Sequence, residues 1–290
     1  MSPADTEPGS RERRAGVMGS PIAHTLSPAL HRAAYVGLGL TSWRYDAVEV
    51  DAAALPAALG ELGPEWVGVS LTMPLKHAVM PLLDEITDLA QAVGAVNTVT
   101  LREGRRLGDN TDVEGIVVAL REAGVERAGE AVVLGGGATA ASALAALGEL
   151  GASAPTLVVR SPERAASALA AAARLGLRPL VWPWVEVADV LPGADVVIST
   201  VPHGVADRLA TPATTGRGVL LDVVYNPWPT PYARAWEASG GTVVAGLEML
   251  VHQAVAQVRA WSGRTPDPAE MRAAGQAALL AQANAGPKGH

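Results

Sequence analysis

The chain has no cysteine and no phenylalanine among its 290 residues, and it has little lysine or asparagine. The lack of cysteine excludes disulfide bonds, thiolate catalysis and cysteine-based metal sites. Lysine occurs only at Lys76 and Lys288, although lysine and arginine together number 22, and asparagine occurs four times. Arginine therefore serves wherever only a positive charge is needed. A lysine or asparagine inside the fold is a candidate for a specific chemical role.

Further absences concern membranes and nucleic acids. No apolar run reaches the roughly 18 residues that a membrane-spanning helix needs. Residues 1–13 are polar and do not resemble a signal peptide, and we expect them and the tail 284–290 to be unstructured. A net charge of −7 argues against a broad surface for nucleic acid or anionic lipid. We therefore expect a cytoplasmic protein, monomeric or homodimeric, that binds small molecules.

Short apolar runs alternate with alanine-rich segments of helical length, and hydrophobic residues make up 49% of the chain. This alternation is typical of βαβ units, in which helices cover both faces of a parallel sheet. The predicted strands are 16–18, 43–48, 66–71, 131–134, 156–159, 181–183, 195–199, 219–222 and 242–244. The predicted helices are 28–36, 52–62, 113–123, 139–150, 163–175, 231–238, 247–262 and 268–281. A predicted hairpin of strands 96–101 and 105–108, with its turn at Glu103-Gly104, interrupts the alternation and places a domain boundary near Asp112.

The clearest binding motif is the segment 131–141, AVVLGGGATAA, in which a strand runs into Gly135-Gly136-Gly137 and then a helix. It matches G-x-G-x-x-A, with Ala140 in the last place. Such glycines allow a tight turn and let a pyrophosphate approach the backbone at a helix N-terminus. The pattern predicts a dinucleotide site in a Rossmann-type domain, and a plain strand–helix turn is the alternative.

The next predicted strand ends at Val159, where an NAD-binding protein usually has an acidic residue for the ribose hydroxyls. This chain instead has Arg160 and Arg164, around a predicted helix start at Ser161-Pro162. Two guanidinium groups and a hydroxyl suit a 2′-phosphate, so the sequence favours NADP over NAD. Glu163 could instead pair with Arg164, and both arginines could be ordinary surface residues.

Lys76 stands just after a predicted strand, in the segment VSLTMPLK. Only an amine, and not a guanidinium, can exchange a proton near neutral pH, so the position indicates proton transfer. Asp112 and Asn97 lie in the segments GDNTD and GAVNT. A carboxylate beside a lysine can help to deliver a proton to an alkoxide, but capping or turn roles are equally open for both residues. The neighbouring residues His24 and His77 suit hydrogen bonding better than metal binding, and we expect no metal site.

Taken together, the motifs resemble those of the shikimate dehydrogenase family. They cover about residues 15–265 in the family's order, namely MGSPIAHTLSPALH, VSLTMPLK, GAVNT, GDNTD, LGGGATA, VRSPERA, YNP and GLEMLVHQ. The resemblance implies a two-domain α/β fold and reversible NADPH-dependent reduction of 3-dehydroshikimate to shikimate. It implies a substrate domain of residues 14–111, completed by the helices 247–284, and a Rossmann-type NADP domain of residues 112–246.

The resemblance also assigns roles to individual residues. Lys76 and Asp112 are the implied catalytic pair. The implied substrate contacts are Thr25, Ser27, Thr72, Asn97, Tyr225 and Gln253. The implied cofactor contacts are Gly135, Gly136, Gly137, Ala138, Arg160, Ser161, Arg164, Val223, Gly246, Met249 and Asp88.

Three positions depart from the family pattern. Thr25 replaces a serine, which leaves quinate or aminoshikimate dehydrogenase as alternative activities. Ser70 replaces an asparagine near Lys76, and Val159 replaces an asparagine beside the arginine pair.

An NADP-binding regulator without catalysis is disfavoured because Lys76 and Asp112 are both present. A folate-type methylene dehydrogenase is disfavoured by the blocks around Asn97 and Asp112.

Overall fold

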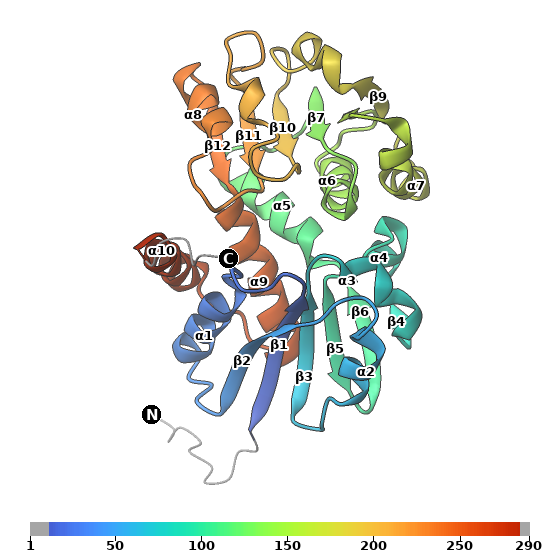
Figure 1. The fold of residues 1–290 in the computed structure, drawn as a ribbon, viewed down its shortest axis with the longest axis vertical. Helices are drawn as coiled ribbons and strands as arrows, with labels where there is room; N and C mark the ends of the chain where they lie inside the picture. Colours follow the sequence, from blue (N-terminus) through green and yellow to red (C-terminus); the bar gives the residue numbers. More distant parts are fainter. Residues whose placement is uncertain (1–11, 285–290) are drawn as a thin grey trace.

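The protein is described here by a computed structural model that covers residues 12–284. Its two β-sheets occupy separate lobes, one above the other, and two long helices run between them (Figure 1). These are α5 (Thr111–Glu122) and α9 (Gly246–Ser262), which pack against each other. The predicted two-domain α/β fold is thereby confirmed. The predictions for residues 1–11 and 285–290 lie outside the described residues.

The first sheet has six strands in the order β2-β1-β3-β5-β6-β4. They are β1 (Arg13–Gly19), β2 (Trp43–Glu49), β3 (Trp66–Leu71), β4 (Glu85–Ile86), β5 (Thr98–Arg102) and β6 (Arg105–Asp109). Strand β1 is parallel to β2 and β3, whereas β5 is antiparallel to both β3 and β6. The predicted hairpin turn is present, with Glu103 at φ 53° and Gly104 at φ 76°. Two successive left-handed residues match the twist of a tight hairpin.

The second sheet also has six strands, in the order β12-β11-β10-β7-β8-β9, and all its pairs are parallel. They are β7 (Ala131–Leu134), β8 (Thr156–Val159), β9 (Leu180–Pro183), β10 (Val196–Ser199), β11 (Val219–Asp222) and β12 (Thr242–Ala245). The strand order reverses between β7 and β10. This is the Rossmann arrangement, in which ligands bind at the carboxyl ends of the strands beside that reversal.

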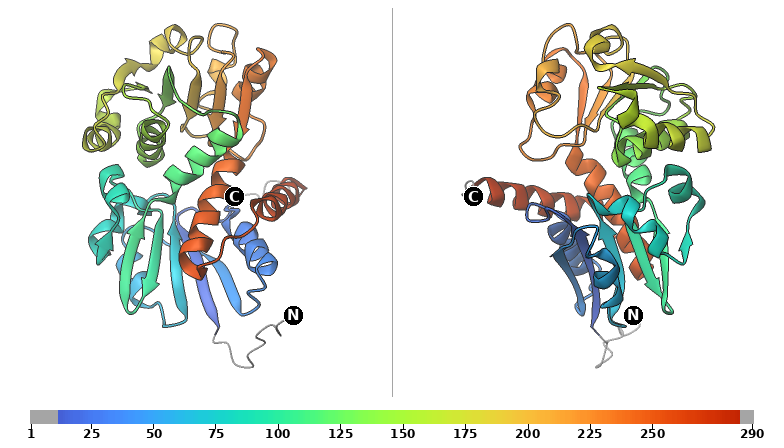
Figure 2. Two further views of the ribbon diagram at one scale, coloured as in Figure 1. Left: turned by 180° about the vertical axis from the view of Figure 1, so that it is seen from behind. Right: turned by 45° about the vertical axis from the view of Figure 1, so that its right-hand side comes forward.

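Helices cover both faces of each sheet, as Figure 2 shows from two further sides. On the first sheet they are α1 (Ser27–Gly37), α2 (Leu55–Gly60), α3 (Leu75–Ala78) and α4 (Asp88–Val93), with α9 and α10 (Pro268–Asn284). On the second sheet they are α5, α6 (Ala138–Glu149), α7 (Ala166–Arg174) and α8 (Pro231–Ala238). Helix α9 packs on β3 and β5, and α10 packs on α1 and α9, so the last helices lie against the first sheet. No described helix combines the length and the apolar character needed to cross a bilayer.

The structure corrects three local predictions. Strand β1 begins at Arg13, which pairs with Trp43, so residue 13 belongs to the sheet and not to an unstructured end. Asn284 likewise ends α10. The helix predicted from residue 163 begins as a 3-10 turn, Pro162–Ala165, and the Ser161 hydroxyl makes no capping bond to its backbone. Such short turns have weaker hydrogen-bond geometry than α-helices.

Candidate functional site

A cavity of about 660 Å³ lies where the two lobes face each other. The first lobe contributes Thr72, Met73, Pro74, Lys76 and His77, which follow the end of β3. The second lobe contributes the glycine turn after β7, the start of α6, the end of β8, and the segment after β10. Lys76 therefore shares one cavity with Gly135, Gly136 and Gly137.

The glycine turn requires glycine at two of its three positions, Gly135 and Gly136. Gly135 has φ +112°, a conformation that side chains rarely adopt. A Cβ on Gly136 would lie 2.7 Å from the Arg164 carbonyl oxygen, whereas the same atom on Gly137 would meet nothing within 4 Å. Gly137 caps α6 and has no side chain, so the first N–H groups of α6 stay free beside the open cavity. This turn fits a pyrophosphate at a helix N-terminus.

Arg160 and Arg164 both line the same cavity, and the β8 residues Val158 and Val159 lie beside them. Glu163 does not neutralise Arg164 through an ion pair among residues 12–284. Its own backbone N–H and the Ser161 hydroxyl hold the pKa of the Glu163 carboxyl below its usual range. Both guanidinium groups are therefore available to a phosphate.

Lys76 and Asp112 form a largely buried ion pair. Lys76 lies on α3, Asp112 lies in the first turn of α5, and the Lys76 Nζ donates to Asp112 Oδ2 at 2.5 Å. The side chains are 15% and 6% exposed. The amine thus stays partly open to the cavity while the carboxylate is held inside, which suits a group that exchanges a proton with a bound molecule.

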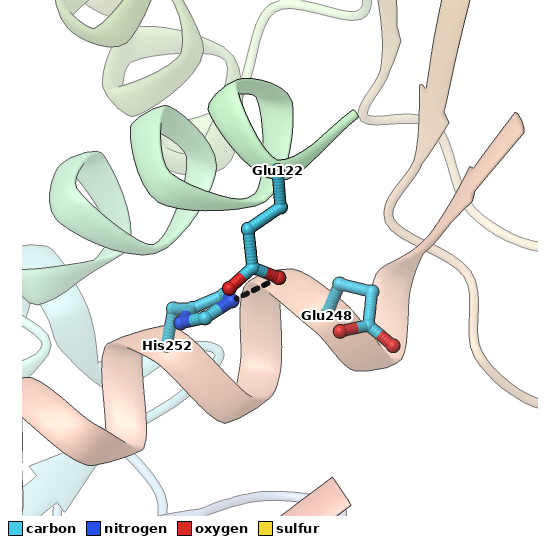
Figure 3. A group of neighbouring side chains, drawn as sticks. All are labelled: Glu122, Glu248 and His252. Carbon is cyan, nitrogen blue, oxygen red and sulfur yellow. Dashed lines mark ion pairs between the residues drawn. The ribbon is translucent and has the colours of Figure 1, made fainter. Parts of the chain in front are cut away.

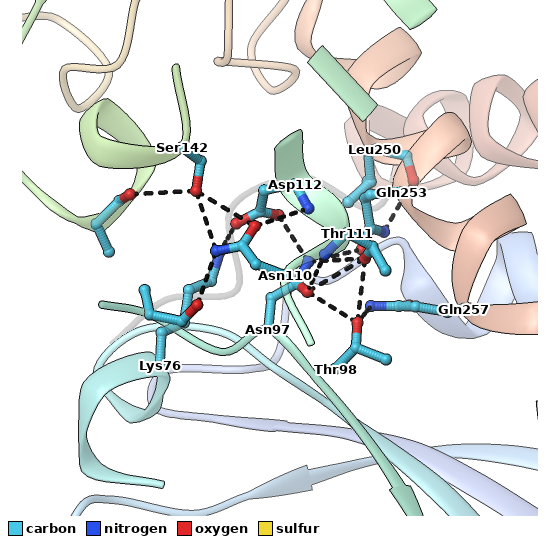
Figure 4. Close-up of polar contacts among 12 residues, drawn as sticks. Lys76, Asn97, Thr98, Asn110, Thr111, Asp112, Ser142, Leu250, Gln253 and Gln257 are labelled. Atoms are coloured by element: carbon cyan, nitrogen blue, oxygen red, sulfur yellow. Dashed lines mark hydrogen bonds and ion pairs between the residues drawn. The ribbon is translucent and has the colours of Figure 1, made fainter. Parts of the chain in front are cut away.

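Asn97 fixes the other oxygen of Asp112, in the polar network that Figure 4 draws. Its Nδ2 donates to Asp112 Oδ1 at 2.8 Å and lies 3.4 Å from the Gln253 Oε1. Its Oδ1 accepts from the Thr111 backbone N–H at 2.8 Å and from the Thr98 hydroxyl at 2.8 Å. An amide is needed because it must donate and accept at once. The structure therefore brings Asn97, Asp112, Lys76 and Gln253 together.

Thr25 and Ser27 also lie together, at the start of α1. The Thr25 hydroxyl donates to Ser27 Oγ at 3.2 Å and accepts the Ser27 backbone N–H at 3.3 Å. Below them, His31 Nδ1 lies 2.9 Å from the Ser27 carbonyl oxygen, and its ring stacks on Tyr45 at 3.9 Å between centroids. Burial lowers the pKa of His31 to about 4, so the ring is neutral and its Nδ1–H donates to that carbonyl. The two adjacent hydroxyls of Thr25 and Ser27, next to the stacked rings of His31 and Tyr45, suit a ligand carboxylate.

Of the other predicted residues, Thr72 and Ala138 line the main cavity. The cavity lining does not include Thr25, Ser27, Asn97, Asp112, Gln253 or Ser161. Tyr225 is half-buried, and burial raises the pKa of its hydroxyl. Val223 and Gly246 touch, since a Cβ on Gly246 would collide with the Val223 carbonyl. Met249 is buried on α9. Asp88 is exposed in the first turn of α4, away from the cavity lining.

Sequence reasoning missed Trp184 and Thr200, which also line the cavity. Trp184 belongs to a short 3-10 turn, Trp184–Asp189, which the hydrophobic pattern of the sequence did not predict. Thr200 directly follows β10, and its hydroxyl donates to the Leu134 carbonyl at 2.7 Å. Thr200 could have been predicted as a site residue, because it follows the carboxyl end of β10, one of the two strands between which the strand order reverses.

A second polar cluster, Glu122, Glu248 and His252, lies between α5 and α9 (Figure 3). Their ligand-type atoms lie within 4.8 Å of one another, a grouping that the sequence analysis did not find. Arg272 of α10, however, contacts both carboxylates, at 2.7 Å to Glu248 and 3.3 Å to Glu122. The cluster is therefore an ion-pair network that ties three helices together, with its acidic charge already partly balanced.

Comparison with known proteins places this geometry in a family. The family model described as shikimate dehydrogenase substrate binding domain matches residues 17–99, and the shikimate 5′-dehydrogenase C-terminal domain model matches residues 246–274. A curated shikimate dehydrogenase (NADP(+)) from Thermus thermophilus is 39% identical over 274 residues, 92% of this chain and 98% of the relative.

Two solved structures are similar over nearly their whole length. Mycobacterium tuberculosis shikimate dehydrogenase is 43% identical with a TM-score of 0.85, over 91% of this chain and 99% of the other. The shikimate 5-dehydrogenase of Thermus thermophilus, solved in complex with NADP(H) and shikimate, is 37% identical with a TM-score of 0.81, over 92% and 100%. The resemblance found in the motifs is confirmed, and this chain belongs to the shikimate dehydrogenase family.

Proposed function

We propose that this protein is an NADP-dependent shikimate dehydrogenase, an oxidoreductase that reversibly reduces 3-dehydroshikimate to shikimate on the route to chorismate and the aromatic amino acids. The observation that carries the proposal is the Lys76–Asp112 pair, whose amine shares one cavity with the glycine turn at 135–137. A proton donor and a dinucleotide-binding turn on facing walls are what reduction of a carbonyl requires.

The second lobe fits NADP through this chain's own groups. The glycine turn and the free N–H groups of α6 suit the pyrophosphate, with Gly135 to Ala138 around it. Arg160 and Arg164 suit the 2′-phosphate, with Ser161 between them in the chain. We assign Val223, Gly246 and Met249 to the nicotinamide end, and Asp88 to a more distant contact. The reduced nicotinamide supplies a hydride to the substrate carbonyl carbon.

Lys76 moves the proton in this mechanism. Its Nζ protonates the carbonyl oxygen as negative charge develops there, and in the reverse direction it receives that proton from the alcohol. Asp112 holds the ammonium through the 2.5 Å ion pair, and Asn97 keeps the carboxylate in place from its other oxygen. Because Asp112 is buried and both of its carboxylate oxygens are bonded, the amine is oriented before the substrate binds.

The substrate is held by hydroxyl and amide groups of the first lobe. Thr25 and Ser27 bind its carboxylate, and Thr72, Asn97, Tyr225 and Gln253 bind its hydroxyls or its carboxylate. The adjacency of Thr25 to Ser27 and of Asn97 to Gln253 supports this assignment. The names of the curated relatives favour shikimate over the quinate or aminoshikimate alternative.

The division of the chain follows from the two sheets and the packing of α9 and α10. We propose a substrate domain of residues 14–111 and 247–284 and an NADP domain of residues 112–246. A cytoplasmic location, a monomeric or homodimeric state and the absence of nucleic-acid binding stay predictions from the sequence.

The test is a set of absorbance assays on the purified protein, with shikimate or quinate as substrate and NADP⁺ or NAD⁺ as cofactor. Shikimate with NADP⁺ should produce the absorbance of reduced nicotinamide, faster than shikimate with NAD⁺ or quinate with either cofactor. Silence with every combination would show that the proposed activity is wrong. Lys76→Ala should lower kcat by roughly a hundredfold or more with a smaller change in KM. Lys76→Arg, which keeps the charge but cannot release a proton, should be similarly slow, and an active Lys76→Arg would refute the acid role.

A further inference from the structure

Asn110 is a buried residue at the junction of the two lobes, and it is the N-cap of α5. Its Oδ1 accepts the backbone N–H of Asp112 at 3.1 Å. Its Nδ2 donates in two directions, to the Ala95 carbonyl in the first lobe at 2.8 Å and to Ser142 Oγ in the second at 3.2 Å. One amide therefore contacts both lobes and also supports the residue that holds Lys76.

Ser142 continues this chain of contacts toward the cofactor cavity. It is fully buried on α6, one turn after Ala138, which lines that cavity. Its hydroxyl lies 3.4 Å from the Ala138 carbonyl oxygen and 3.4 Å from Asn110 Oδ1. Because Asn110 Nδ2 donates to Ser142, the single hydroxyl proton is free for the Ala138 carbonyl. Figure 4 draws this path from Asp112 through Asn110 to Ser142.

The residue type at position 142 is itself unusual for its surroundings. Helix α6 reads ATAASALAALGE, and its buried neighbours Ala140, Ala141 and Ala143 are all apolar. Alanine would fit there without leaving a buried hydroxyl to be satisfied. Besides the contact that a helical serine commonly makes with the carbonyl one turn earlier, here that of Ala138, the Ser142 hydroxyl contacts Asn110.

We infer that Ser142 and Asn110 are positioning residues, which couple the start of α6 at the cofactor cavity to the placement of Asp112. A ligand that fixes the first turn of α6 fixes Ser142, and through Asn110 it fixes the first turn of α5, where Asp112 lies. The bond from Asn110 Nδ2 to the Ala95 carbonyl holds the same amide against the first lobe. This inference rests on the proposed function, because it concerns the residues of that site.

The experiment measures binding coupling as well as turnover. Shikimate and NADPH are both reduced and cannot react together, so calorimetry can give the Kd of shikimate with and without saturating NADPH. The ratio of the two values is the coupling factor, which wild type should show as a clear departure from one. Ser142→Ala should move this factor about three- to tenfold toward one, and lower kcat by a similar factor with little change in either KM.

Two further variants make the result specific. Ser199→Ala removes an equally buried hydroxyl from β10 of the same lobe and should leave both the coupling factor and kcat unchanged. Asn110→Ala should show the larger loss, and adding Ser142→Ala to it should change little more, because the two residues act in series.

The outcomes separate cleanly. An active wild type with a coupling factor of one, a Ser142→Ala variant that matches wild type, or the same change in Ser199→Ala would overturn the inference alone. A wild type that oxidises no shikimate would overturn the proposed function and the inference with it. A fall in melting temperature without a change in coupling would show a structural role only, and would also overturn the inference.

Discussion

Lys76 is the sole lysine among residues 12–284, and the two buried asparagines Asn97 and Asn110 contact or support its partner Asp112. All three belong to residue types that are rare in this chain, which has two lysines and four asparagines. The structure shows why each type is retained, since an amide donates and accepts at once and an amine releases a proton. Aspartate at either asparagine position would lose the bonds that the amide Nδ2 donates.

Arg160 gives a prediction at the cofactor end of the site. Arg160→Ala should raise the KM for NADP⁺ about tenfold or more, because a charge-assisted bond to the 2′-phosphate is lost, and should change the KM for NAD⁺ little. Arg178→Ala removes an exposed arginine of the same lobe outside the cavity lining and should have no effect. Equal losses for both cofactors would remove the 2′-phosphate assignment.

His31 gives a prediction on pH and stability. Burial lowers its pKa to about 4 in the folded protein from an ordinary value of 6.5. Between these values the unfolded chain binds a proton that the folded protein does not, so stability falls as pH drops from 6.5 toward 4 and stops falling below that range. The slope should approach about 1.4 kcal/mol per pH unit.

Urea unfolding at several pH values can isolate this contribution. His31→Phe keeps an aromatic ring against Tyr45 but cannot titrate, so its stability should depend less on pH between 4 and 6.5. The lost bond to the Ser27 carbonyl should only add a constant offset. Identical pH slopes in wild type and variant would contradict a buried neutral histidine.

At the scale of elements, the crossing of α5 and α9 depends on Gly115. A Cβ there would lie 2.7 Å from the Met249 carbonyl oxygen and 3.0 Å from the Gln253 Cβ. Gly115→Ala should therefore destabilise the protein by about 1–3 kcal/mol, although alanine is the better helix former, and should also lower turnover because Asp112 and Gln253 lie on these helices.

The control for this prediction is another helical glycine. Gly60 ends α2, and a Cβ there would meet nothing within 4 Å. Gly60→Ala should be neutral or slightly stabilising in thermal unfolding. If the two variants melted alike, the close approach of α9 to α5 would not be what requires glycine.

Elements with a continuous apolar pattern were predicted well, including the four-residue strands β7, β8 and β11, which have the predicted bounds. Both α5 and α9 were predicted within two residues of their observed bounds. Strand β4 and helix α4 were missed, because two and six residues carry too little periodicity. Helix α2 is shorter than expected, since residues 52–54 form a turn in which Asp51 accepts the backbone N–H groups of Ala53 and Ala54.

At the scale of the whole molecule, α9 packs on the first sheet and on α5, so the lobes share a helical support. We expect one cooperative calorimetric transition. NADPH at about a hundred times its Kd should raise the stability by about 2.7 kcal/mol and move the whole transition up by several degrees. NADH at the same concentration should move it less. Two transitions, of which NADPH moves only one, would show that the lobes unfold independently.

The sequence by itself determined the residue types, the glycine turn, the arginine pair and the order of the strands and helices, because these depend on local pattern and composition. Only the tertiary structure decided which residues meet. Lys76 and Asp112 are 36 positions apart, and Asn97 and Gln253 are 156 apart, and each pair is joined by packing of the elements that carry them. The link from Asn110 to Ser142 left no trace in any local pattern, because a single serine in an alanine-rich helix acquires its role only from the residue that packs against it.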